Sequence, residues 1–590
     1  MTEQKNTELG TEAVLWNLAD LYTGIDDPAI DIDLNWCDSE AGNLQKQYSG
    51  RVNVLSEEAF LDLVTRLEQL ETRLTKIATF ASLNFATRTK DAAVAAFLQK
   101  IREQNSQINK KTIFFELEWG KTAEGFAEKI INSPLLATYA HYLKNLRRYA
   151  PHLLSHAEET LLLEIAPVGR GSWNNLFDKV MGHLKFGTSG RTEEEVLADL
   201  YRADRETRGQ AARELTEGLE SQLHVLTHIF NTLLADKMIS DRLRSYPAWV
   251  SSMNLYNELE NETVQVLIEA VTSRYDIPAR YYRLKRDLIG LPELLDYDRY
   301  APLPHLPDAE ITWDESRDMV LAAFAAFSPD MAEIAGYFYD RSWIHAPLME
   351  GKRGGAFAHP CIPEIHPYIM VNYTGNLRDV STVAHELGHG VHQYLAAERG
   401  YYNSGTPLVL AETASVFAEL LLFTHQLDLL KDTRGKKAFV CQKLESIFAT
   451  VFRQVAMNRF EDLAHNARRS KGELPREEIS RLWLQTQQAM FGDSVTLTDN
   501  YSIWWSYIPH FLNSPGYVYS YAFGELLVLS LYKIYQQEGE LFIPKYIQLL
   551  QAGGSSSPYD LVSRFGVDLN DPGFWQGGLA LIDELLKTVE

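Results

Sequence analysis

Cysteine is scarce in this sequence, which has three in 590 residues: Cys37, Cys361 and Cys441. An odd number of widely separated cysteines does not form a disulfide framework and lacks the paired spacing of a structural zinc site. The pattern is typical of buried free thiols in a reducing compartment. We therefore expect a cytoplasmic protein.

Long apolar runs and an excess of positive charge are also missing. No stretch offers eighteen uncharged apolar residues, and the run Leu420–Phe423 is too short to span a bilayer. The polar segment Met1–Asn6 is not followed by the apolar segment that a secretory signal would contain. The net charge of −23 argues against nucleic acid or an anionic membrane as the main partner. The sequence leaves the oligomeric state open.

The chain is long, and its apolar residues recur with helical spacing. At 590 residues it can form two or more domains. Glycine becomes frequent between residues 166 and 195, which suggests a boundary. We expect a flexible tail over 1–12, a helical lobe over 13–190 and a catalytic domain over 191–590. Apolar residues recur with helical spacing in Leu55–Leu74, Asp91–Gln107, Ser155–Ile165, Glu193–Asp241, Asn261–Leu288 and Asp314–Phe327.

The most informative motif is H-E-x-x-H, from His385 to His389. On an α-helix, residues i and i+4 lie on one face about a turn apart, so both imidazoles can bind one zinc ion. Glu386 lies to the side of that pair, where it can act as a general base on a metal-bound water. We therefore predict a metal site, and coincidence is the weaker explanation.

The residues around this motif favour a helix. Ala384, Leu387 and Val391 continue to Leu395 as one apolar stripe, away from the histidines. Gly388 and Gly390 are unfavourable in a helix interior by about 1 kcal/mol each. They suggest the close approach of another segment, although a locally tolerated defect would give the same pattern.

A catalytic zinc site needs a third protein ligand. His392 lies about 10.5 Å along the helix axis from His385, so a supporting or core role suits it better than ligation. A metzincin would carry histidine at position 395, which is leucine here. Glu412 is the better candidate for the third ligand, because the turn-rich link 403–407 lets a second helix return beside the first. Glu398 is an alternative. Glu419, two turns after Glu412, is a candidate acceptor for a ligand N–H.

Two further segments have open interpretations. Residues 366–373 resemble a strand, and Pro367 at its start favours an edge position that could pair with an extended peptide; a simple packing strand is equally compatible. The aromatic stretch 504–521 contains His510, Tyr517 and Tyr521. These side chains could stabilise an oxyanion, but aromatic core packing explains the pattern as well.

Taken together, the motifs resemble those of oligoendopeptidase F, a branch of the thimet-oligopeptidase-like zinc metallopeptidases. The resemblance rests on His385–His389 with His392, on Glu412–Ser415, and on His510 with Gly516–Gly524. It continues into 16–22 and 566–569 and so covers nearly the whole chain. It implies a mainly α, two-lobed fold with a deep substrate channel and a small β-sheet beside the metal-binding helix.

The resemblance also implies roles for individual residues. His385, His389 and Glu412 would bind one Zn²⁺, and Glu386 would be the base. His510 and Tyr517 would assist the oxyanion, with Tyr521 on the substrate side. In the wider family the spacing between the assisting histidine and the first assisting tyrosine varies; here it is seven residues and includes Pro515.

We therefore expect a zinc endopeptidase that cleaves short unstructured oligopeptides. Two alternatives remain. An exopeptidase would use the same metal chemistry but needs a cation, such as Arg353, for the substrate's C-terminal carboxylate. A non-catalytic peptide-binding relative is the second, and the intact Glu386 argues against it.

Overall fold

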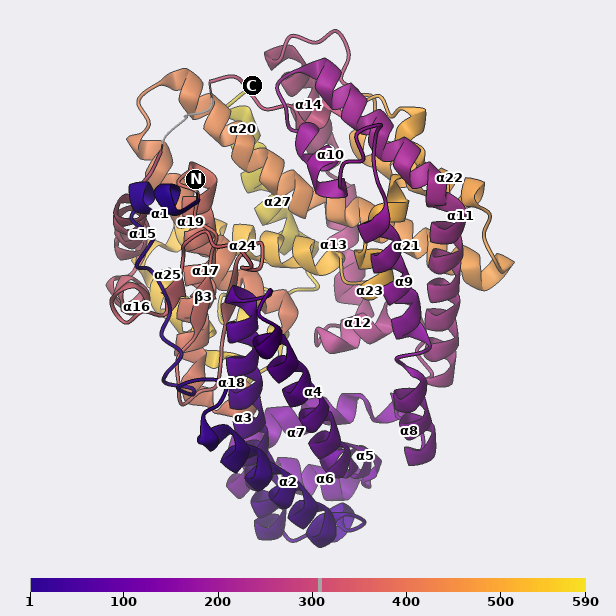
Figure 1. The fold of residues 1–590 in the computed structure, drawn as a ribbon, viewed down its shortest axis with the longest axis vertical. Coiled ribbons are helices and arrows are strands. Elements are labelled where there is room, and N and C mark those ends of the chain that lie inside the picture. Colours follow the sequence, from indigo (N-terminus) through magenta and orange to yellow (C-terminus); the bar gives the residue numbers. More distant parts are fainter. Residues whose placement is uncertain (1, 306–309) are drawn as a thin grey trace. The chain divides into compact units, whose positions relative to one another are not determined.

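A computed structural model describes residues 2–305 and 310–590, and the chain divides into two compact units (Figure 1). Each unit is assembled from three separate stretches, so the boundaries predicted at residues 12 and 190 do not coincide with the units. A change in local composition cannot reveal a unit whose parts are distant in sequence. The first unit comprises Met1–Ala150, Asp308–Leu429 and Ile534–Gly566, and the second comprises Pro151–Pro307, Leu430–Lys533 and Val567–Glu590.

The N-terminal segment is ordered where we expected a flexible tail. Helix α1 spans Thr2–Leu9, and Leu9 is fully buried. The Asn6 side chain donates to the Leu348 carbonyl at 2.8 Å and accepts the Leu348 N–H at 2.9 Å. These contacts hold the segment within the first unit. Met1 lies outside the described residues.

The first unit consists of helices and one small sheet. Its long helix α3 begins at the Ser56 cap and buries Leu63, Leu67 and Leu70 along one face, as the periodicity predicts. Its helices are α1, α2 (Pro28–Tyr48), α3 (Glu57–Thr87), α4 (Ala92–Thr112), α5 (Phe114–Lys121), α6 (Glu124–Ile131), α7 (Ala140–Arg148), α15 (Trp313–Phe327), α16 (Pro329–Asp340), α17 (Leu377–Ala396), α18 (Tyr401–Ser404), α19 (Leu408–Leu429), α25 (Phe542–Ala552) and α26 (Pro558–Ser563).

The strand order of the small sheet contradicts the prediction that residues 366–373 form an edge strand. Its strands are β1 (Ile344–His345), β2 (Phe357–His359) and β3 (Tyr368–Met370), in the order β1-β3-β2. Strand β3 is central: it pairs in parallel with β1 and antiparallel with β2. Pro367 precedes the strand, so its missing N–H costs no ladder hydrogen bond. Because both sides of β3 are paired, it is a packing strand and cannot accept a peptide.

The second unit is helical. The predicted helix 193–241 is two helices, because the Asp204 side chain accepts the Thr207 N–H and starts a new one. Its core packs aromatic residues such as Phe460, Trp483 and Phe511 together. Its helices are α8 (His156–Ile165), α9 (Arg170–His183), α10 (Glu193–Asp199), α11 (Arg205–Leu243), α12 (Ser251–Tyr256), α13 (Asn261–Thr272), α14 (Asp276–Leu288), α20 (Thr433–Thr450), α21 (Phe452–Lys471), α22 (Arg476–Phe491), α23 (His510–Asn513) and α27 (Pro572–Lys587); the division between the units falls within α24 (Tyr519–Glu538).

One helix in the described part of the chain, α19, is long and apolar enough to cross a membrane. Its most apolar window is 67% buried within the fold, and the core helix of a soluble protein has the same composition. Helix α25 packs against it: the Tyr546 hydroxyl donates to the Thr413 carbonyl at 3.0 Å. Core packing accounts for its apolar character.

Candidate active site

Helix α17 carries the H-E-x-x-H motif and starts at a capping box. The Asn376 side chain accepts the Asp379 N–H at 3.0 Å, which fixes the first turn. The predicted apolar stripe is buried, with Ala384 and Leu387 fully inaccessible. His385 and His389 lie on another face with ring centroids 4.8 Å apart, so the helix presents both imidazoles together.

The two glycines of the motif mark close approaches. A Cβ atom on Gly388 would lie 2.6 Å from the Ala414 carbonyl oxygen of α19, and one on Gly390 would lie 2.7 Å from the Phe338 ring. The predicted approach of another segment is therefore confirmed. Figure 1 shows α17 and α19 adjacent, and only a residue without a side chain permits this spacing at Gly388.

Three of the predicted residues form a group suited to a metal ion. Ligand atoms of His385, His389 and Glu412 all lie within 4.8 Å of one another. The Nε2 atoms of the two histidines are 3.5 Å and 3.6 Å from Glu412 Oε2. Ligands bound to zinc at about 2.0–2.1 Å in a tetrahedral arrangement lie about 3.4 Å apart. The residues therefore fit a zinc ion, and within the described residues no other such group is found.

Carboxylates surround the first histidine. Glu419 Oε1 lies 2.6 Å from His385 Nδ1, which leaves Nε2 directed to the ligand group. The negative charges of Glu419, Glu412 and Glu386 all act on His385. The Ser415 hydroxyl donates at 2.7 Å to Glu412 Oε2, the same oxygen that lies near both histidines. This local excess of negative charge suits a divalent cation.

Glu386 is the one member of the motif that is not in the ligand group. It is 6% exposed, and burial raises its pKa to about 7, although the neighbouring His385 and a hydrogen bond from the Ala358 backbone oppose the shift. A carboxyl group with a pKa near neutrality can both take and return a proton. A bound cation would lower this pKa.

His392 and Glu398, the other residues considered as a third ligand, lie outside the ligand group. His392 is buried, and its Nε2 lies 3.2 Å from the Thr406 hydroxyl in the link before α19. This contact joins His392 to the turn that returns the chain to Glu412. Glu398 is exposed beyond the end of α17 and does not belong to the ligand group.

The predicted oxyanion residues belong to the second unit and form a group of their own. The His510 Nε2 atom lies 3.3 Å from the Tyr521 hydroxyl, and the Tyr517 and Tyr521 ring centroids are 5.0 Å apart. All three side chains are partly exposed, whereas the nearby Trp504 and Trp505 are 1% exposed. Core packing therefore describes the tryptophans but not these three residues.

A buried glutamate holds the turn before Tyr517. Glu461 of α21 is 1% exposed, and its Oε1 accepts the Gly516 N–H at 2.9 Å. Gly516 has a φ of +82°, and a Cβ there would meet Val250 at 3.3 Å, so glycine suits both the conformation and the space. Glu461 is not among the residues predicted from the sequence. In the sequence, only its spacing to the polar residues Asn458 and His465, at i−3 and i+4, places it on a polar face of the helix; the contact with Gly516 has no local signal.

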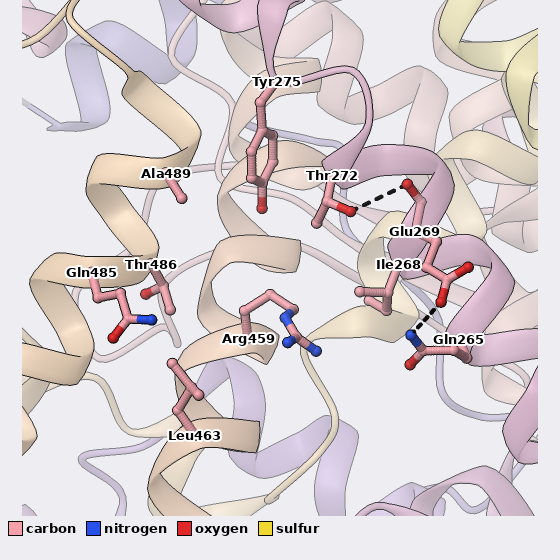
Figure 2. Close-up of a pocket in the computed structure, with 10 residues that line it drawn as sticks. All are labelled: Gln265, Ile268, Glu269, Thr272, Tyr275, Arg459, Leu463, Gln485, Thr486 and Ala489. Carbon is pink, nitrogen blue, oxygen red and sulfur yellow. Dashed lines mark hydrogen bonds between the residues drawn. The ribbon is translucent and has the colours of Figure 1, made fainter.

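The second unit also contains a pocket of about 440 Å³ among α13, α21 and α22. Figure 2 shows the Tyr275 hydroxyl and the Arg459 guanidinium directed into this space. None of the residues predicted from the sequence contributes to it, so the pocket is separate from both groups described above. Its lining residues are Gln265, Ile268, Glu269, Thr272, Tyr275, Arg459, Leu463, Gln485, Thr486 and Ala489.

Comparison with known proteins decides the family. The model of peptidase family M3 matches residues 329–581, which include the H-E-x-x-H motif, Glu412 and the segment 510–521, and the model of oligopeptidase F matches residues 118–186. The chain belongs to peptidase family M3. Within it the chain falls in the oligoendopeptidase F branch, and it is a metalloendopeptidase.

Individual relatives match this M3 peptidase over nearly its whole length. Oligopeptidase PepF of Bacillus subtilis is 25% identical over 98% of this chain and 86% of its own length. Among solved structures, a peptidase from Chlamydophila abortus has a TM-score of 0.85 at 23% identity, covering 98% of both chains. Oligoendopeptidase-F from Enterococcus faecium has a TM-score of 0.71 at 21% identity, covering 95% of this chain and 96% of its own. The two structures establish the fold.

Proposed function

We propose that this M3 peptidase is a zinc-dependent endopeptidase that hydrolyses internal peptide bonds of short unstructured oligopeptides. The observation that carries the proposal is the group formed by His385, His389 and Glu412, with Glu386 beside it on α17. The spacing of the three ligand atoms suits zinc, and the fourth position of a catalytic zinc site is free for substrate or water.

In the first unit, the residues in and around the ligand group have separate parts in the proposed reaction. A bound zinc ion would supply Lewis acidity for the scissile carbonyl and the attacking water. The Glu386 carboxylate takes a proton from that water and delivers it to the nitrogen of the leaving amine. Glu419 accepts the His385 Nδ1–H and so keeps the other ring nitrogen available as a ligand.

The second unit would contribute the groups that stabilise negative charge. We assign Tyr517 and His510 as hydrogen-bond donors to the oxyanion of the tetrahedral intermediate, and Tyr521 to the substrate side. Their partial exposure and mutual proximity support this assignment. The deep substrate channel that the family resemblance implies would admit short peptides and exclude folded proteins.

The proposed setting is the cytoplasm, with one zinc ion per chain and oligopeptides as substrates. All three cysteines are buried and free, as a reducing compartment favours. The names of the relatives, oligopeptidase PepF in Bacillus subtilis and oligoendopeptidase-F in Enterococcus faecium, agree with peptide substrates.

Digestion of a mixed peptide library tests the proposal directly. The enzyme is loaded with zinc, incubated with the library with and without chelator, and the products are identified by mass spectrometry. We expect internal cuts in short peptides that disappear with chelator and in the Glu412→Ala variant, which should lose its metal. Cuts confined to a fixed distance from free C-termini would favour an exopeptidase, and intact peptides would favour a binding protein.

A further inference from the structure

The pocket of Figure 2 lies wholly within the second unit. Helices α13 and α22 both pack against α21, and all three helices contribute lining residues. The volume of about 440 Å³ falls within the range of about 300–1,000 Å³ that is usual for small-molecule sites. Ile268 is buried and Leu463 is half-buried, so part of the wall is aliphatic. The space suits a small ligand with an apolar body.

Arg459 of α21 gives this pocket a cation, and Figure 2 shows its guanidinium directed into the space. Its Nη1 atom lies 3.4 Å from Asp462 Oδ2, which is longer than the about 2.7–2.9 Å of a close charge-assisted hydrogen bond. The other oxygen of Asp462 accepts N–H groups from Trp249 and Asn466, both at 2.9 Å. A guanidinium carries several N–H donors, so Arg459 keeps donors for a ligand.

Two neutral donors line the same space. The Tyr275 hydroxyl is buried and, within the described residues, has no hydrogen-bond partner; Figure 2 shows it directed into the pocket. Gln485 Oε1 accepts the Arg481 N–H at 3.2 Å, which leaves its Nε2 as a donor. An unpaired buried hydroxyl is unfavourable, and a carboxylate bound at Arg459 would offer it an acceptor.

The pocket also has an anion. Glu269 of α13 accepts the Gln265 amide N–H at 2.7 Å, and it forms no ion pair in the described part of the chain. Arg459 and Glu269 therefore line one cavity with opposite charges that do not pair with each other. Because Asp462 and Glu269 already offset the single guanidinium, a doubly charged phosphate is disfavoured. A zwitterion, with one carboxylate and one ammonium group, complements both charges.

We propose that this pocket binds a free amino acid or dipeptide with an aliphatic side chain. Arg459 and Tyr275 hold the carboxylate, and Glu269 holds the ammonium group. Ile268 and Leu463 contact the aliphatic side chain. Each hydrolysed peptide bond leaves one new carboxylate and one new amine, so short products of a peptidase belong to this chemical class. The pocket is separate from the metal group and does not depend on the mechanism proposed there.

Ligand-observed NMR titration of the full-length protein tests the wild type first. The probes are L-leucine, glycyl-leucine, N-acetyl-leucine, which lacks the ammonium group, and leucinamide, which lacks the carboxylate. We expect leucine or glycyl-leucine to bind with a Kd of about 0.1–1 mM. Compared with leucine, N-acetyl-leucine should bind about 2- to 5-fold more weakly and leucinamide about 5- to 20-fold more weakly, because each loses one charged contact.

Variants then assign each contact. Arg459→Gln should weaken leucine binding about 5- to 20-fold and leave leucinamide unchanged. Glu269→Gln should weaken leucine binding about 2- to 5-fold and leave N-acetyl-leucine unchanged. Ala489→Leu, which removes no charge, should fill the pocket and weaken binding of every probe. Arg476→Gln on α22 and Glu262→Gln on α13 are the controls, since both residues are exposed and neither lines the pocket.

Three results would each overturn the inference. The first is a wild type that binds neither leucine nor glycyl-leucine, a measurement that needs no variant to fold. The second is tighter binding of inorganic phosphate than of leucine, which would make the pocket an anion site. The third is leucine binding that survives both Arg459→Gln and Ala489→Leu, which would place the ligand elsewhere on the protein. The proposed peptidase reaction fails on a different result, namely a zinc-loaded wild type that cuts no peptide.

Discussion

The Nδ1 atom of His385 lies 2.6 Å from Oε1 of Glu419, seven residues after Glu412 on the same helix. Seven residues are about two helical turns, so one face of α19 supplies both a proposed ligand and the acceptor that orients another ligand. The metal group therefore depends on the register between α17 and α19.

The contact predicts that Glu419→Gln weakens metal binding without abolishing it. An amide is a poorer acceptor than a carboxylate for the His385 N–H, and loss of such outer contacts typically costs about 10- to 100-fold in metal affinity. Zinc affinity is measured by competition with a chromophoric chelator. Glu398→Gln, at an exposed site just beyond α17, should bind zinc like the wild type. Equal affinity in the Glu419 variant would show that the 2.6 Å contact does not orient the ligand.

A second prediction separates metal binding from catalysis. Glu386→Gln removes the proposed base and leaves the ligand group untouched, so zinc content should stay at the wild-type level. Turnover of a cleaved peptide should fall about 10²- to 10⁴-fold, the usual contribution of a general base. Metal analysis and kcat are measured on the same preparation. A zinc-loaded variant with near-wild-type kcat would exclude Glu386 as the base.

The third prediction concerns the contact between the two helices. Gly388→Ala places a Cβ atom 2.6 Å from the Ala414 carbonyl oxygen, and backbone cannot move aside as a flexible side chain can. We expect a loss of about 1–3 kcal/mol from overpacking, together with weaker zinc binding as α19 shifts. Thermal unfolding and zinc titration measure the two effects. Gly577→Ala in α27 is the control, because its Cβ would meet nothing within 4 Å. A Gly388→Ala protein with unchanged unfolding midpoint and zinc affinity would contradict this packing.

These predictions depend on features that were readable from the sequence to different degrees. The histidine pair and its glycines follow from helix geometry alone, because all four lie within one helix. Glu412 required a guess about a turn and a returning helix, which the structure supplies through α18 and the Thr406–His392 contact. The central position of β3 could not be read, since it depends on β1 and β2, which are two and three residues long. Likewise, Glu461 contacts Gly516 across 55 residues, and no local pattern encodes that distance.

The fourth prediction addresses the hydroxyl groups of the second unit. Tyr517→Phe keeps the ring and its packing against Tyr521 but removes a donor proposed for the oxyanion. Because that interaction strengthens only in the transition state, kcat should fall by about 10²-fold or more while KM changes little. Tyr521→Phe, on the proposed substrate side, should act mainly on KM. An effect of Tyr517→Phe confined to KM would make it a substrate-positioning residue.

The last prediction uses the buried carboxyl group that holds the turn before Tyr517. Burial raises the pKa of Glu461 to about 8, against the opposing effects of the Gly516 N–H and the Lys237 charge. In the unfolded chain the same group titrates near its ordinary value of 4.5. Between these two values the folded protein therefore holds a proton that the unfolded chain has released, so this group's stabilising contribution is complete below 4.5 and is lost as the pH rises through about 8.

Glu461→Gln keeps an oxygen to accept the Gly516 N–H but has no proton to lose. The variant should therefore lose less stability than the wild type when the pH is raised from about 5 to about 8, by up to a few kcal/mol. Unfolding midpoints at the two pH values measure the difference, and Glu473→Gln, an exposed site just after α21, should behave like the wild type. Parallel pH profiles for Glu461→Gln and the wild type would mean that Glu461 is ionised in the folded protein. In that case its carboxylate, and not a neutral carboxyl group, holds the Gly516 turn.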